Sequence, residues 1–199
     1  MTFAVFVSGF GSNLQAIIDA VKKKQIKADL SLVVSDNPQS YALKRAFKAK
    51  IKTVIVNPKD FFNKETCDGA IIACLKREKI DFIVLAGYMR ILSPLFIKNY
   101  KNYILNIHPA LLPAFKGAHA IKDAFDFGVK VTGVTVHFVD EKVDHGAIIF
   151  QEAILVKPAD TLASLEKRIH SMEHRLYPKA IDLFARKKIK VSGRKVRIG

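Results

Sequence analysis

Short apolar runs alternate with longer amphipathic stretches through the first half of the chain. Apolar runs bounded by turn residues predict strands, and amphipathic stretches with a helical period predict helices. We expect strands at 3–7, 30–34, 54–56 and 82–85, and helices at 14–23, 41–48, 64–76 and directly after Ser93-Pro94. This alternation is typical of βαβ units, which form a parallel sheet.

The second half of the chain has a different pattern. Residues 131–139 and 147–156 are rich in β-branched side chains and are separated by a short turn, which favours an antiparallel pair. We expect a loop over 110–130, a long helix from about 160 to 185, and a terminal hairpin over 189–198. The predicted fold is therefore α/β: one doubly wound, largely parallel sheet with an antiparallel C-terminal portion.

A polar pair follows the apolar run at 103–105. Pro109 has no amide hydrogen for a sheet, so it ends the strand. Alternate strand residues share a face, so Asn106 and His108 should lie together at the carboxyl edge, where open α/β sheets bind ligands. An amide donor beside an imidazole is suited to stabilising an oxyanion and moving a proton.

The composition is that of a globular protein, since half of the residues are apolar and about a quarter are charged. No apolar run is long enough to span a bilayer, and no basic region precedes the first one, so we expect a cytoplasmic protein. Cys67 and Cys74 lie on one predicted helix, about 10.5 Å apart along its axis. That separation excludes a disulfide and agrees with a reducing compartment.

The net charge of +15 does not by itself indicate a nucleic-acid-binding protein. The lysines are spread along the chain, and the clusters at 22–24 and 186–188 lie near expected helix ends, where cations complement the helix dipole. Neither cluster has the interleaved aromatic residues that stack on bases. A solvated basic surface is favoured over a nucleic-acid footprint, and steering of small anionic substrates is a third interpretation.

A glycine-rich turn, Gly9-Phe10-Gly11-Ser12-Asn13, joins the first strand to the first helix. Backbone amides at such a turn favour an anion. The third glycine of a dinucleotide fingerprint is absent, because position 14 is leucine. A single phosphate on the amides of Gly11, Ser12 and Asn13 fits the pattern, and a plain tight turn capped by Ser12 fits it equally well.

Two further segments combine charged groups with apolar residues. In 85–92, apolar residues surround Arg90 and could line a slot for a flat ligand that carries a carboxylate, although a buried loop with one surface arginine is an equal alternative. In 137–146, Asp144 could orient an imidazole, while a plain polar turn is the simpler interpretation. His108, His119, His137 and Asp144 form no local ligand motif, so we expect no metal.

Taken together, the segments 9–13, 85–92, 106–113 and 136–144 closely resemble the glycinamide ribonucleotide formyltransferases, which belong to the formyltetrahydrofolate-dependent transferases. The resemblance runs in order along essentially the whole chain. It implies one formyltransferase domain, 1–199, with a phosphate-binding half at about 1–100 and a folate-binding, catalytic half at about 101–199. It also implies transfer of a formyl group from 10-formyltetrahydrofolate to the amine of glycinamide ribonucleotide in purine biosynthesis, by a monomer or homodimer.

The resemblance also assigns residues. Asn106 and protonated His108 would hold the oxyanion, and Asp144 would stabilise the imidazolium and help to relay a proton. The substrate-binding residues would be Gly11, Ser12, Asn13, Lys64 and Glu173, and the folate-binding residues Met89, Arg90, Ile91, Leu92, Val139, Asp140 and Val143. Ala110, Lys64 and His170 depart from the serine, arginine and polar amide that are common in the family.

The Asn-x-His-Pro core with a distant aspartate is shared by relatives with other substrates. Methionyl-tRNA formyltransferases add a C-terminal barrel domain and formyltetrahydrofolate hydrolases add an N-terminal regulatory domain, and we expect neither in this chain. A basic nucleic-acid-binding module remains an alternative on charge alone. It leaves Asn106, His108 and Asp144 unexplained.

Overall fold

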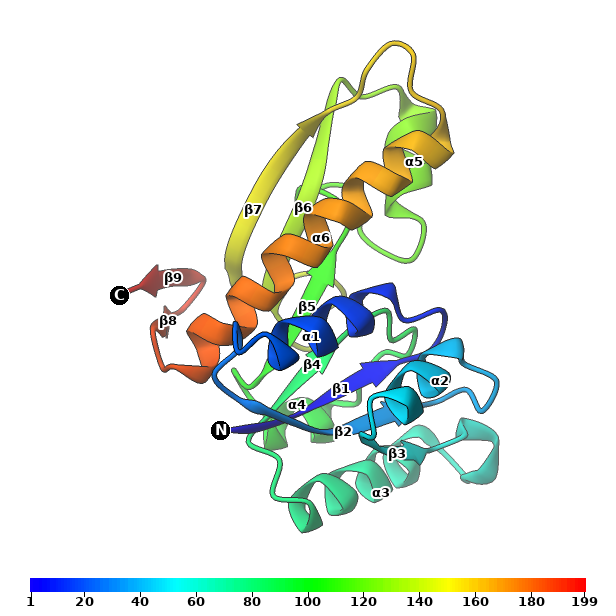
Figure 1. Ribbon diagram of the computed structural model, residues 1–199, viewed down its shortest axis with the longest axis vertical. Helices are drawn as coiled ribbons and strands as arrows, with labels where there is room; N and C mark the ends of the chain where they lie inside the picture. The colour runs from blue at the N-terminus through cyan, green and yellow to red at the C-terminus, as the bar shows by residue number, and fades with distance from the viewer.

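The computed structural model describes residues 1–199 and is built on a seven-stranded sheet with helices on both faces (Figure 1). Its strands, in the spatial order of the sheet, are β3 (Lys52–Ile55), β2 (Asp29–Ser35), β1 (Thr2–Val7), β4 (Phe82–Leu85), β5 (Ile104–His108), β6 (Val131–Phe138) and β7 (Ile148–Leu155). The first five are mutually parallel, and β6 and β7 are antiparallel to their neighbours. The predicted fold class is confirmed.

The helices are α1 (Ser12–Lys22), α2 (Tyr41–Lys48), α3 (Lys64–Arg77), α4 (Pro94–Asn99), α5 (Ala120–Phe127) and α6 (Leu162–Ala185), with a 3-10 turn η1 (Pro58–Asp60). The chain adds β2 and β3 to one side of β1 and then crosses to β4 on the other side. The loops after β1 and β4 therefore diverge at the point where the winding reverses, and such a switch point is where open sheets bind ligands.

Two apolar cores cover the two faces of the sheet. The larger core joins one face to α1, α2 and α6, and the smaller one joins the opposite face to α3 and α4. Figure 1 shows α6 (orange) running across the sheet beside α1. The fully buried Tyr177 of α6 places its hydroxyl 2.7 Å from the carbonyl oxygen of Leu85 and 2.9 Å from that of Leu105, so one side chain ties α6 to the end of β4 and to β5.

Local capping explains where several helices begin. Ser93 caps α4 by accepting from the amide of Phe96, with Pro94 in the first turn, as predicted. Thr161 and Ser164 form a capping box at the start of α6. The terminal hairpin is also confirmed, as β8 (Ile189–Ser192) and β9 (Lys195–Ile198).

One prediction was wrong: residues 110–130 are not a continuous loop, because they contain α5. Its two turns bury Ala120, Ile121 and Ala124, and it ends at Gly128, whose left-handed conformation is typical of a residue just after a helix. Strand β5 runs through Asn106 to His108, directly before Pro109. None of the helices is both long and apolar enough to cross a membrane.

Candidate active site

A cavity of about 1200 Å³ opens at the carboxyl ends of β1, β4 and β5. The glycine-rich turn after β1, the segment 85–92 after β4 and the end of β5 form part of its wall, and residues 139–144 and α6 complete it. Chain segments that are far apart in sequence thus share one chamber. Of the predicted site residues, only Lys64 lies outside the lining of this cavity, at the first residue of α3.

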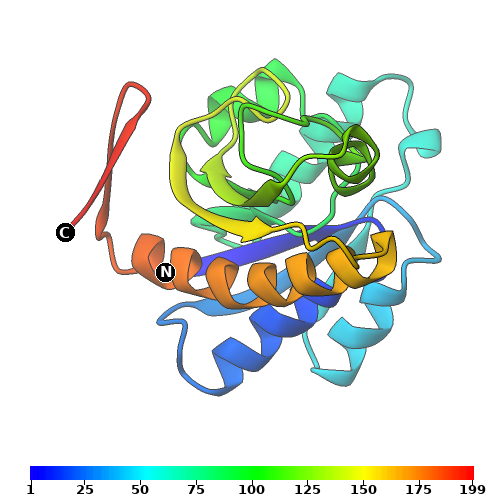
Figure 2. The ribbon, with the colours of Figure 1, turned by 90° about the horizontal axis from the view of Figure 1, so that it is seen from above.

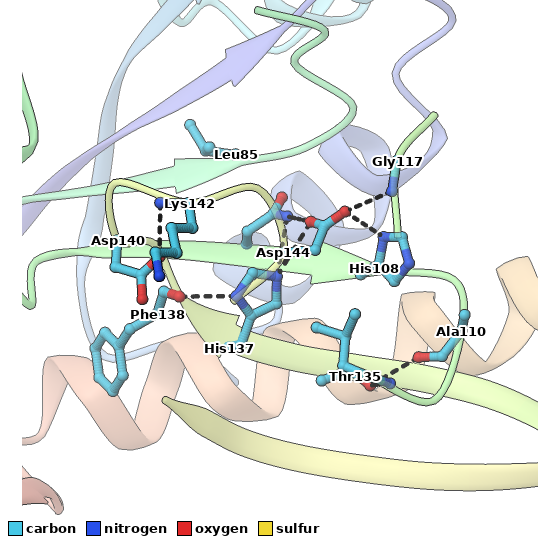
Figure 3. A network of polar contacts seen from close by, with 12 residues as sticks. Leu85, His108, Ala110, Gly117, Thr135, His137, Phe138, Asp140, Lys142 and Asp144 are labelled. Atoms are coloured by element: carbon cyan, nitrogen blue, oxygen red, sulfur yellow. Dashed lines mark hydrogen bonds and ion pairs between the residues drawn. The ribbon is translucent and has the colours of Figure 1, made fainter. Parts of the chain in front are cut away.

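Asn106, His108 and Asp144 lie together in the wall of the cavity. Nδ1 of His108 is 3.3 Å from Oδ2 of Asp144, and Nδ2 of Asn106 is 3.5 Å from Oδ1 of the same carboxylate. The amide of Gly117 donates to Asp144 Oδ2 over 2.8 Å, as Figure 3 shows. The structure therefore places the carboxylate of Asp144 beside Asn106 and His108 of β5, although Asp144 is far from both in the sequence.

The contacts of His108 determine its tautomer. Nε2 lies 2.7 Å from the carbonyl oxygen of Phe115, and a carbonyl oxygen only accepts hydrogen bonds, so Nε2 carries the hydrogen. Burial lowers the pKa of His108, and the attraction of Asp144 offsets only part of this effect. The imidazole is therefore neutral at neutral pH, and Nδ1 presents a lone pair to the cavity wall beside Asp144.

Asp144 stays ionised beside this neutral ring. Burial acts to raise the pKa of Asp144, but it is outweighed by His137 when its Nε2 is protonated, by the amide of Gly117 and by His108 when its ring is charged, so the pKa is lowered. The resemblance assigns protonated His108 to the tetrahedral intermediate, so the ring would gain its second proton during the reaction. An added proton on Nδ1 would lie beside a carboxylate that is already charged, which favours the imidazolium once it forms.

His137 is a site residue to which the sequence assigned no role. Its Nδ1 lies 2.7 Å from the carbonyl oxygen of Phe138, so Nδ1 carries the hydrogen and Nε2 accepts one from Nδ2 of Asn106 over 3.2 Å. This contact fixes the orientation of the Asn106 amide, because Nδ2 and not Oδ1 must face Nε2 of His137. The register of the sheet pairs Asn106 with His137 across β5 and β6, and that pairing is not visible in the sequence.

The glycine-rich turn leads into α1 without a side-chain cap. The N-cap is Gly11 with φ 75°, which corrects the alternative that Ser12 caps the helix. A Cβ atom on Gly11 would lie 2.6 Å from the Cβ of Ala42, so α2 packs directly against the turn. The first amides of α1 therefore lie at the cavity with no side chain to cap them, which suits an anion.

Glu173 of α6 lies at the floor of the cavity and is almost completely buried. Its Oε2 accepts from Nδ2 of Asn13 over 3.2 Å and from Nδ1 of His170 over 2.8 Å. The hydrogen bond to Glu173 raises the pKa of His170. His170 and Glu173 both line the cavity, and Glu173 links α6 to the glycine-rich turn.

The predicted folate residues lie in two loops of the cavity wall. Met89 and Ile91 expose large apolar side chains at this wall, and Val143 lies in the segment that contains Asp144. Arg90 also lines the cavity, and its Nη1 donates to Sγ of Cys67 over 2.9 Å while its Nη2 is 3.9 Å from Asp68. The guanidinium is held against α3, which reduces its capacity to bind a ligand carboxylate.

Two chemical features of the wider structure bear on the site. Cys67 and Cys74 are buried free thiols, as predicted. The structure contains no group of three or more His, Cys, Asp and Glu side chains arranged to hold a metal ion. The polar groups at the cavity are instead hydrogen-bond donors, one carboxylate beside an imidazole, and a helix N-terminus.

Comparison with known proteins gives a consistent result. Residues 1–181 match the family model described as formyl transferase. The chain is 45% identical over 179 residues to the phosphoribosylglycinamide formyltransferase of Bacillus subtilis, covering 90% of this chain and 92% of that protein. It is also 47% identical to part of the trifunctional purine biosynthetic protein adenosine-3 of Gallus gallus, of whose length it spans only 18%.

Solved structures agree with the sequence relatives. The crystal structure of glycinamide ribonucleotide transformylase 1 from Symbiobacterium toebii superposes with a TM-score of 0.97 at 42% identity, covering 100% of this chain and 93% of that one. A phosphoribosylglycinamide formyltransferase from Bacillus halodurans gives a TM-score of 0.91 at 42% identity, covering 94% and 96%. The chain therefore belongs to the formyl transferase family, among the phosphoribosylglycinamide formyltransferases.

Proposed function

We propose that this enzyme transfers the formyl group of 10-formyltetrahydrofolate to the amine of glycinamide ribonucleotide, yielding formylglycinamide ribonucleotide and tetrahydrofolate in purine biosynthesis. One observation carries the proposal: Asn106, His108 and Asp144 meet in a cavity that also contains the uncapped N-terminus of α1. The first three groups suit an acyl transfer, and the helix terminus suits a phosphate. The family membership supports the same pair of substrates.

In this reaction the amine nitrogen attacks the formyl carbon and the carbonyl oxygen becomes an oxyanion. Nδ2–H of Asn106 and Nε2–H of His108 would donate to that oxygen, which adds stabilisation where charge develops. The carbonyl of Phe115 now accepts the hydrogen on Nε2, so it must leave before the formyl oxygen takes its place. His137 keeps the amide of Asn106 turned with its nitrogen toward the site.

The proton of the attacking amine must then leave the intermediate. Nδ1 of His108 has a free lone pair beside ionised Asp144, so this pair can take the proton. The proton passes to N10 of the folate, the bond between N10 and the formyl carbon breaks, and the carbonyl reforms on the new amide. Asp144 would thus act as the charge partner of a transient imidazolium.

The remaining residues would bind the two substrates. The amides of Gly11, Ser12 and Asn13 would hold the phosphate. Glu173 would accept hydrogen bonds from the ribose or glycinamide end, with His170 and Asn13 holding its other oxygen in place. The folate ring would lie between 89–92 and the segment containing Val139, Asp140 and Val143. Lys64, which lies outside the lining of the cavity at the start of α3, is given no contact with the phosphate.

We further propose that the partners are small molecules and that no metal or nucleic acid takes part. The charge of +15 would then serve solubility or the capture of anionic substrates. The buried free thiols support a cytoplasmic location. Binding of tRNA or duplex DNA at low salt would contradict the exclusion of nucleic acid, because electrostatic binding is strongest there.

The proposal is tested by following the absorbance of the formyl donor in the presence and absence of glycinamide ribonucleotide. We expect loss of the donor only when the acceptor is present. Equal loss of the formyl donor without the acceptor would indicate a formyltetrahydrofolate hydrolase. Formyl transfer to methionyl-tRNA and not to glycinamide ribonucleotide would indicate a methionyl-tRNA formyltransferase. No turnover with any acceptor would refute the substrate assignment.

A further inference from the structure

The hairpin β8–β9 lies beyond the residues that match the family model, and the proposed reaction does not use it. Ile189, Val191 and Val196 pack against the larger core, and β9 lies beside β7. Figure 2 shows the hairpin (red) as an arm at the side of the sheet. Its turn contains Gly193, with φ 58°, followed by Arg194. The apolar contacts anchor this arm, and its turn reaches the segment between β6 and β7.

Arg194 lies over the ring of His145. Its Nη1 is 3.3 Å from Nδ1 and 3.2 Å from Nε2 of that imidazole. Nδ1 and Nε2 of His145 are both bonded to the same ring carbon, Cε1. If Nη1 of Arg194 lay in the plane of the ring at these nearly equal distances from both nitrogens, it would overlap Cε1. Nη1 of Arg194 therefore lies over the face of the ring, while Nδ1 of His145 forms its in-plane contact with Oδ2 of Asp140 over 2.7 Å.

The segment 139–147 needs such support. It contains Asp144, which adopts φ 46°, a left-handed conformation that costs energy for a residue with a side chain. Its far end passes so close to β6 that a Cβ on Gly146 would lie 1.8 Å from the carbonyl oxygen of Phe138. The Asp140–His145 pair is about 40% exposed, and an isolated pair of that kind contributes little.

We propose that Arg194 is a positioning residue, through which the C-terminal hairpin restricts the segment 139–147 and keeps Asp144 and the folate-facing side chains in their binding geometry. The hairpin supplies a rigid anchor, Arg194 supplies a planar cation, and His145 with Asp140 transmits the restraint to the segment. This inference rests on the proposed function for its catalytic consequence. Its structural part, the restraint of 139–147, does not depend on that function.

The first test measures amide hydrogen exchange of residues 139–147 in the substrate-free protein, comparing Arg194→Ala with Arg197→Ala. Arg197 is the matched control, because it is an exposed arginine of the same hairpin with no hydrogen bond or ion pair. Arg194→Ala should speed exchange in this segment about two- to fivefold, the size expected for one exposed cation–π contact. Arg197→Ala should leave it unchanged, and equal exchange in the two variants would overturn the proposal.

The second test uses steady-state kinetics and a double variant. Arg194→Ala should raise KM for 10-formyltetrahydrofolate about two- to fivefold and leave KM for glycinamide ribonucleotide unchanged, because the proposed function places only the folate against Val139, Asp140 and Val143. In a His145→Ala background, Arg194→Ala should have no further effect on exchange or KM. An undiminished effect in that background would contradict the stacking contact. If the wild-type protein fails to transfer formyl groups, the proposed function fails while the exchange measurements still decide the restraint.

Discussion

Nε2 of His108 lies 2.7 Å from the carbonyl oxygen of Phe115, and this contact determines the tautomer of the neutral imidazole. It fixes the hydrogen on Nε2, leaves Nδ1 free beside Asp144, and occupies the donor that the proposed oxyanion requires. The substrate-free enzyme thus has a neutral imidazole whose two nitrogens already differ in function. The consequences of this arrangement can be measured.

The pKa of His108 should lie below the ordinary histidine value of 6.5, because burial outweighs the attraction of Asp144. A depressed pKa means that His108 contributes stability above pH 6.5, and that this stability is lost as the pH falls through the lowered pKa. NMR titration of labelled histidines in the free protein measures it, with His108→Gln for assignment. His170, whose pKa is raised by Glu173, should titrate above 6.5 in the same spectra. A titration of His108 above 6.5 would contradict the neutral resting state.

Asp144→Asn should lower kcat/KM by at least about 10²-fold, because the amide cannot stabilise an imidazolium as a carboxylate does. Asp126→Asn is the control: Asp126 pairs with Lys122 on the exposed side of α5 and should tolerate the change. Initial rates with both substrates measure the effect. An unchanged rate in Asp144→Asn would remove the carboxylate from the mechanism.

His137 should matter for turnover because it orients the amide of Asn106. His137→Phe removes the acceptor that orients Asn106, so kcat should fall by about tenfold or more, less than the roughly 10²- to 10³-fold typical of a lost oxyanion donor. His137→Gln supplies a new acceptor oxygen and should recover part of the rate. KM values for both substrates should change little. Equal rates in the two variants would show that the contact does not orient Asn106.

The segment that contains Asp144 should not tolerate a side chain at position 146. Gly146→Ala would place a methyl group against the carbonyl of Phe138, so the strand must shift and the free energy of unfolding should fall by about 1–3 kcal/mol. Gly69→Ala is the matched control, because it lies in α3 with open space around it. That change should raise stability by about 0.5–1 kcal/mol. Urea denaturation distinguishes the two, and a neutral Gly146→Ala would show that the segment can relax.

The sequence was sufficient for the features that depend on local pattern. Periodicity located every strand of the sheet and all of the helices except α5, which was missed because it is only two turns long and residues 109–119 separate it from β5. Its signals were present: Ala120 and Ala124 have helical spacing, and Gly128 follows the last residue. The capping of α4 was predictable because Ser93 and Pro94 are adjacent.

Features that depend on pairing between distant segments could not be predicted. Asn106 and His137 meet through the register of an antiparallel pair, and no local pattern specifies that register. The tautomer of His108 depends on the carbonyl of Phe115, which comes close only after the loop beyond β5 has turned back. Arg90 was expected to face a ligand, but its contact with Cys67 depends on how α3 packs on the sheet.

The most direct test of formyl transfer uses 10-formyltetrahydrofolate labelled with ¹³C in the formyl carbon. After incubation with glycinamide ribonucleotide, mass spectrometry of the nucleotide should show one labelled formyl group per molecule on the glycinamide nitrogen, with little label in free formate. Asp144→Asn should form this product at least about 10²-fold more slowly. Label recovered only in formate, or no labelled nucleotide with the wild-type enzyme, would contradict the proposed function.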